Sequence, residues 1–112
     1  MAVVEKGSSS QMIERSQAYE IVVASLREVF EQTGTEAPAK VGDETVLVGT
    51  DAVLDSLGIV QLIVEIEQRV EGAHGVSITL ASDKAMSQRN SPFRTVGVLT
   101  DHVIATAQEA AP

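Results

Sequence analysis

The chain has 112 residues, which suits a single domain with a modest hydrophobic core. It carries a formal net charge of -8 and contains no cysteine, so disulfide bonds and thiolate metal sites are excluded. This charge has the opposite sign to that of nucleic-acid-binding domains and disfavours that function class. There is no run of about 18 apolar residues, so we expect no membrane-spanning segment.

The composition also favours packed helices. Hydrophobic residues make up 44% of the chain and aromatic residues only 3%, so the core must be aliphatic. Residues 36–67 hold seven acidic residues and one basic residue, a local net charge of -6. Such a region suits partners with basic surfaces, although acids also serve simply to keep a small domain in solution. The N-terminus lacks the basic and apolar stretches of a secretory signal, and we expect a cytoplasmic monomer.

The chain order predicts a flexible leader over residues 1–9, a helical domain over 10–109 and a flexible tail over 110–112. A first helix is expected from about residue 11 to 32, with Gly34 as its natural C-terminal stop. Its apolar residues recur at helical spacing and should face the core. They are Met12, Tyr19, Val22, Val23, Leu26, Val29 and Phe30.

A long connection then spans residues 33–54 and contains Pro38, Gly42 and Gly49. Connections of more than about 12–15 residues without regular structure are unusual in compact domains and are often functional. The apolar residues 46–48 within it are expected to fold back onto the helices.

The second predicted helix, from residue 56 to about 71, has a core stripe at helical spacing. The stripe consists of Ile59, Leu62, Ile63, Ile66 and Val70. Asp55 and Ser56 stand where this helix begins, and either residue type is a good N-cap. In that simple interpretation the pair does no more than start the helix.

Ser56 is also a candidate modification site. Its hydroxyl is expected at a loop-to-helix junction and not in the core, and His74 and His102 lie far along the chain. Without a nearby base, this serine suits being modified better than acting as a nucleophile for substrates. The N-terminus of a helix presents free N–H groups and a partial positive charge, which favour a negatively charged group at this position.

The stretch LDSLG at residues 54–58, followed by VQLIVEIE at 60–67, resembles the attachment site of acyl carrier proteins. In that family the serine of an Asp-Ser-Leu triplet carries a 4'-phosphopantetheine arm. The resemblance covers about residues 19–104. It implies an all-α fold, a small antiparallel four-helix bundle with a long first loop and a short third helix. It places the arm on Ser56 between Asp55 and Leu57, and it implies no catalytic residues.

The resemblance also implies partners. A phosphopantetheinyl transferase would attach the arm from coenzyme A. An acyl- or aminoacyl-activating ligase or synthase would load a thioester, and a downstream acyltransferase would unload it. Typical fatty-acid carriers have acids soon after the triplet, whereas this chain has Gly58 and Gln61. The pattern is therefore more similar to specialised carriers, of lipid or secondary-metabolite pathways or of the D-alanyl type.

Two further alternatives stay open to different degrees. Peptidyl carriers usually have a Gly-Gly-x-Ser-Leu sequence before the helix, and the Val53-Leu54-Asp55 sequence here argues against that class. A helical adaptor that never carries an arm is the alternative from a different class. Failure of a transferase to modify the chain would favour the adaptor.

Three apolar residues of the second helix, Leu57, Val60 and Val64, lie outside its core stripe. Leu57 is expected to contact partner proteins, whereas Val60 and Val64 suit a partner surface or a broad buried face equally. We include Glu65 and Glu67 in the predicted docking surface because they are the next acids along this helix.

The remaining chain is expected to return along the bundle. Residues 76–80 alternate between apolar and polar, which predicts a short extended segment, and a short third helix is expected at 83–88. Thr95 should cap a final helix that runs to about residue 108, with His102 facing solvent. The buried stripe of this helix is Val96, Leu99, Val103 and Ala107.

Overall fold

The computed structural model describes residues 13–49, 52–81 and 91–110. These residues form three α-helices and no β-strand: α2 at Arg15–Thr33, α3 at Ser56–His74 and α5 at Val96–Ala110. The all-helical class is therefore as predicted. The expected leader at 1–9 and the short third helix at 83–88 lie outside the described residues, as do residues 111–112 of the tail. None of the described helices is long and apolar enough to cross a membrane.

Both ends of helix α2 are capped by hydrogen bonds to backbone groups that the helix itself leaves without partners. The side chain of Gln17 accepts a hydrogen bond from the backbone N–H of Glu14 at 3.0 Å, so the helix begins at Arg15 and not at residue 11. At the other end Gly34 adopts φ 70°, and its N–H donates to the carbonyl of Glu31. The predicted stop at Gly34 is confirmed.

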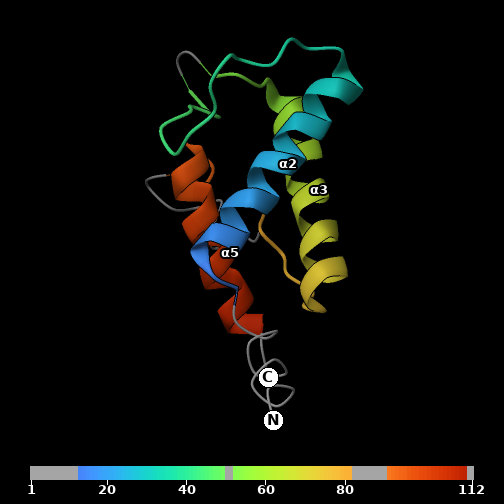
Figure 1. The fold of residues 1–112 in the computed structure, drawn as a ribbon, viewed down its shortest axis with the longest axis vertical. Helices are drawn as coiled ribbons and strands as arrows, with labels where there is room; N and C mark the ends of the chain where they lie inside the picture. The colour runs from blue at the N-terminus through green and yellow to red at the C-terminus, as the bar shows by residue number, and fades with distance from the viewer. Residues whose placement is uncertain (1–12, 50–51, 82–90, 111–112) are drawn as a thin grey trace.

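Helix α2 packs against both α3 and α5 (Figure 1). The core between the helices is aliphatic apart from Phe30 and Phe93, as the composition predicts. The fully buried side chains of the helices include Val22, Leu26, Val29, Leu62, Ile66, Val70, Val96, Leu99 and Val103. Ile59 and Ile63 of the predicted α3 stripe pack against this core but are only partly buried.

Residues 75–81, which we call the connecting segment, lead from the end of α3 toward α5 without regular secondary structure (Figure 1). Its apolar residues 76, 78 and 80 are buried and its residues 77, 79 and 81 are exposed, as the alternation predicts. The backbone N–H of Leu80 donates to Glu67 on α3 at 2.9 Å, and its carbonyl lies 2.9 Å from Nε2 of His102 on α5. The Leu80 peptide groups thus bridge two helices.

The expectation that His102 faces solvent is wrong. The ring is half-buried and lies edge-on to Phe93, with the ring centroids 5.6 Å apart. Position 102 lies on the flank of the buried stripe through Leu99 and Val103, so the ring packs while its Nε2 reaches the carbonyl of Leu80. A histidine in this position supports the fold of the connecting segment.

The long loop before α3 is tied to the start of α5. Leu47 is fully buried, and its N–H donates to the carbonyl of Arg94 at 2.7 Å. Val46 forms an isolated antiparallel bridge with Thr95, and its carbonyl accepts from the N–H of Val53 at 3.0 Å. The loop therefore folds back as predicted, with Val46 half-buried and Val48 exposed on either side of Leu47. This anchoring fixes the chain just before Ser56.

Candidate functional site

The start of α3 is capped by Asp55, which leaves Ser56 free. The carboxylate of Asp55 accepts a hydrogen bond from the N–H of Gly58 at 2.8 Å, and its carbonyl accepts from Ile59 at 3.0 Å. Ser56 is the first helical residue and is exposed. Among the described residues no hydrogen-bond partner for its hydroxyl is found. The capping role therefore belongs to Asp55 alone.

A hollow of about 460 Å³ lies beside Ser56, where the long loop, the first turn of α3 and the chain before α5 meet. We call it the apolar hollow because most of its wall is aliphatic or aromatic. It is lined by Leu47, Val48, Gly49, Ala52, Leu54, Asp55, Ser56, Ile59, Ser91 and Phe93. An apolar part of a group attached to Ser56 would lose contact with water here.

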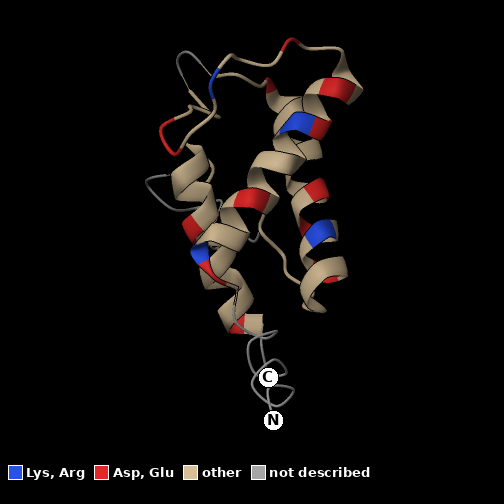
Figure 2. Ribbon diagram, viewed as in Figure 1, with Lys and Arg blue, Asp and Glu red and all other residues tan. Residues whose placement is uncertain are grey.

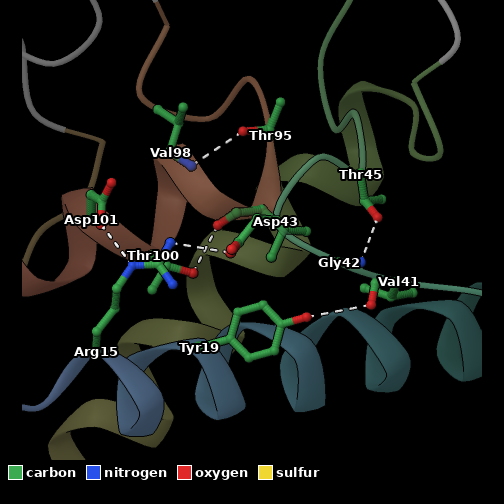
Figure 3. A network of polar contacts seen from close by, with 11 residues as sticks. Arg15, Tyr19, Val41, Gly42, Asp43, Thr45, Thr95, Val98, Thr100 and Asp101 are labelled. Atoms are coloured by element: carbon green, nitrogen blue, oxygen red, sulfur yellow. Dashed lines mark hydrogen bonds and ion pairs between the residues drawn. The ribbon is translucent and has the colours of Figure 1, made fainter.

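An ion-pair network centred on Arg15 links the long loop to two helices (Figure 3). The guanidinium of Arg15 on α2 lies 3.1 Å from Asp43 of the loop and 3.2 Å from Asp101 of α5. The hydrogen bonds to Asp43 and then to Asp101 raise the pKa of Arg15 above its ordinary value. Because the pKa of Arg15 is higher in the folded state than in the unfolded state, protonation of Arg15 favours folding at every pH below the unfolded-state pKa. This contribution is lost only when the pH rises through the folded-state pKa.

The backbone of Asp43 is held as well. Its carbonyl accepts from the N–H of Gly97 at 2.8 Å, and that of Thr45 accepts from Val96 at 3.0 Å, so loop carbonyls satisfy free amides at the start of α5. A Cβ at position 97 would lie 3.1 Å from the Asp43 carbonyl oxygen, and glycine permits this close approach. The Tyr19 hydroxyl donates a hydrogen bond to the backbone carbonyl of Val41 at 3.3 Å (Figure 3).

The solvent side of α3 next to Ser56 is apolar. Leu57, Val60 and Val64 are 63%, 57% and 45% exposed, so none of the three belongs to the core. We call these residues the apolar face of α3. Residues 56–64 contain no charged side chain, and Figure 2 shows the charges of α3 in its other half. Exposed apolar residues grouped on one helix are typical of a surface that contacts another molecule.

The two acids of the predicted docking surface are engaged within the chain. Glu65 pairs with Arg69 one turn further along α3 at 3.1 Å, and its side chain is 22% exposed. The carboxylate of Glu67 accepts a hydrogen bond from the backbone N–H of Leu80. Their contribution to partner binding stays a prediction, whereas the contact of Glu67 stabilises the connecting segment.

The predicted site residues Asp55, Ser56 and Leu57 lie together at the start of α3. The structure also places residues from other segments beside them, which the sequence did not indicate. Phe93 and Ser91 come from the chain before α5, and Val48 from the loop. No group of three or more His, Cys, Asp or Glu residues able to hold a metal ion occurs in the part of the chain that the structure describes.

Three features of the site bear on its function: an exposed serine at a capped helix start, the apolar hollow and the apolar face of α3. No family model, curated protein or solved structure gives a significant match to the chain.

Proposed function

We propose that this chain is a cytoplasmic acyl carrier protein that bears a 4'-phosphopantetheine arm on Ser56. The observation that carries the proposal is the position of Ser56, exposed as the first residue of α3 and beside the apolar hollow, while Asp55 caps the helix. In this proposal the fold is a small antiparallel four-helix bundle, with residues 83–88 as its short third helix. The resemblance of residues 54–67 to carrier attachment sites supports the same function.

The chain would supply the acceptor for the arm and no catalytic group. The Ser56 hydroxyl oxygen forms a bond to the phosphorus atom of coenzyme A that carries the pantetheine. The pyrophosphate P–O bond breaks, adenosine 3',5'-bisphosphate leaves, and a base of the transferase takes the serine proton. When bound, the arm supplies a terminal thiol on which acyl groups are held as thioesters.

The local geometry fits a phosphodiester at this position. The first turn of a helix presents N–H groups that lack partners within the helix, together with a partial positive charge. In α3 the side chain of Asp55 satisfies the N–H of Gly58, which leaves the amides of Ser56 and Leu57 at the helix start. The apolar hollow adjoins the same serine and would cover apolar parts of the arm or its cargo.

The apolar face of α3 would be the docking surface for partner enzymes. Because Leu57, Val60 and Val64 are exposed beside Ser56, a partner that covers them also reaches the serine. The proposed partners are a phosphopantetheinyl transferase, an activating ligase or synthase that loads an acyl or aminoacyl group, and an acyltransferase that removes it. A D-alanyl carrier that serves an adenylating ligase is the variant with an amino acid as cargo.

The exposure of the same apolar face also favours a second candidate, a helical adaptor that binds partners without being modified. Intact-mass measurement after incubation with coenzyme A and a phosphopantetheinyl transferase separates the two. A carrier gains the mass of one phosphopantetheine, whereas an adaptor keeps its original mass while still binding partners.

A further inference from the structure

A second hollow, of about 480 Å³, lies between the end of α2 and the first turns of α3. We call it the polar hollow. It is lined by Gln32, Thr33, Thr35, Val53, Leu54, Asp55, Leu57, Gly58 and Gln61. It shares Leu54 and Asp55 with the apolar hollow beside Ser56. A flexible group attached to Ser56 can therefore reach it around the start of α3.

The wall of the polar hollow is rich in hydrogen-bond acceptors and poor in free donors. The Thr33 hydroxyl donates to the carbonyl of Val29 at 2.9 Å and lies 2.8 Å from the Thr35 hydroxyl. Because the Thr33 proton is already used, Thr35 donates in that contact, and only lone pairs remain on both oxygens. The side-chain N–H₂ of Gln32 donates to Glu28 at 3.2 Å, which leaves the Gln32 amide oxygen as a further acceptor.

Gln61 carries the clearest sign that a donor is missing. Its side-chain oxygen is buried and has no hydrogen-bond partner among the described residues. A buried acceptor without a donor is unfavourable, and such groups in folded proteins are usually paired. Since Gln61 lines the polar hollow, an N–H group that enters the hollow can supply the missing donor once the side chain turns its oxygen toward the hollow.

The lining also restricts the chemistry of the ligand. No lysine or arginine lines the hollow, which disfavours an anion, and its single carboxylate, that of Asp55, already accepts from Gly58. A neutral group with both an N–H donor and a carbonyl acceptor matches the side-chain amide of Gln61. An amide is such a group, and fewer polar side chains line the apolar hollow than the polar one.

We propose that the polar hollow holds an amide of the phosphopantetheine arm on Ser56, with Gln61 as its hydrogen-bond partner. This inference rests on the proposed function. The arm would be tethered next to the hollow, so its effective concentration there is of millimolar order, which is enough to populate a site of millimolar affinity. The hollow would then keep the arm against the protein between encounters with partners.

The test uses the full chain loaded with an arm that carries ¹⁵N in its amides. Intact mass first verifies that wild type, Gln61→Leu and Gln68→Leu each gain one arm. Gln68 is the matched control because it is an exposed glutamine on the same helix, outside the polar hollow. Hydrogen exchange of the arm amides is then measured by NMR and compared with that of free pantetheine.

In wild type and in Gln68→Leu we expect at least one arm amide to exchange several-fold more slowly than in free pantetheine, and Gln61→Leu to abolish the protection. The side-chain N–H₂ signals of Gln61 in wild type should also shift on loading, a readout that needs no variant. Loaded wild type with unprotected arm amides and unshifted Gln61 signals would overturn this inference alone. Absence of the mass gain in wild type would instead overturn the proposed function.

Discussion

The carboxylate of Asp55 accepts a hydrogen bond from the backbone amide of Gly58 at 2.8 Å, and this contact spans Ser56. Because the side chain of Asp55 already caps the first turn of α3, the serine that follows it is not needed for the cap. Gly58 is buried, whereas Ser56 is exposed. The arrangement separates the structural role from the proposed functional one within four residues.

Replacement of Asp55 measures the cap. Asp55→Ala should lower the free energy of unfolding by about 0.5–2 kcal/mol, because the Gly58 amide loses its acceptor. Asp55→Asn keeps an acceptor oxygen and should stay close to wild type. Urea denaturation of the three proteins measures the difference. An asparagine variant as unstable as the alanine variant would mean that charge, and not the cap, stabilises this end of α3.

Two glycines of α3 provide a matched pair. At Gly72 an added Cβ meets nothing within 4 Å, so Gly72→Ala should raise the stability by about 0.5–1 kcal/mol. At Gly58 the same atom would lie 3.1 Å from Cδ2 and 3.2 Å from Cβ of Leu54. Gly58→Ala should therefore give no gain. Equal gains in thermal denaturation at both positions would show that Leu54 moves aside freely.

Leu57→Lys tests the apolar face of α3. Since Leu57 is exposed, we expect the free energy of unfolding to change by less than about 0.5 kcal/mol. The rate of arm attachment by the transferase should fall several-fold, because a partner would have to cover the new charge. Val98→Lys is the control, as Val98 is also exposed but lies on α5. Similar losses in both variants would argue against a specific surface on α3.

The two acids Glu65 and Glu67 of α3 should differ in how much each stabilises the fold. Glu67→Ala leaves the N–H of Leu80 without its acceptor and should cost about 1–3 kcal/mol in unfolding free energy. Glu65→Ala removes only the pair with Arg69 and should cost about 0.3–0.5 kcal/mol. Denaturation midpoints compare the two variants. If Glu67→Ala were the milder change, the bridge through Leu80 would not stabilise the connecting segment.

Local patterns predicted the parts of the fold that short-range physics determines. The stripe of α2 predicted that Val22, Leu26 and Val29 are buried, and the stop at Gly34 follows from its freedom at positive φ. The expected cap at Thr95 is present, since its hydroxyl accepts from the N–H of Val98 at 3.1 Å. Each of these features depends on neighbours within about one or two helical turns.

The walls of the candidate site depend on contacts between distant parts of the chain, which no local pattern shows. Arg15 meets Asp43 and Asp101 across 28 and 86 residues. The sequence around His102 gives no sign of its hydrogen-bond partner, because Leu80 lies 22 residues away in the chain. The two hollows likewise become visible only when the loop and the helices are packed.

The most direct test of the central claim is the intact mass after incubation with coenzyme A and an active, broad-specificity phosphopantetheinyl transferase. Wild type and Ser91→Ala should each gain one phosphopantetheine, and Ser56→Ala should gain none. Ser91 is the matched control because it lines the same apolar hollow. A wild-type protein that stays unmodified, or a Ser56→Ala protein that still gains the arm, would contradict the assignment of Ser56 as the attachment site.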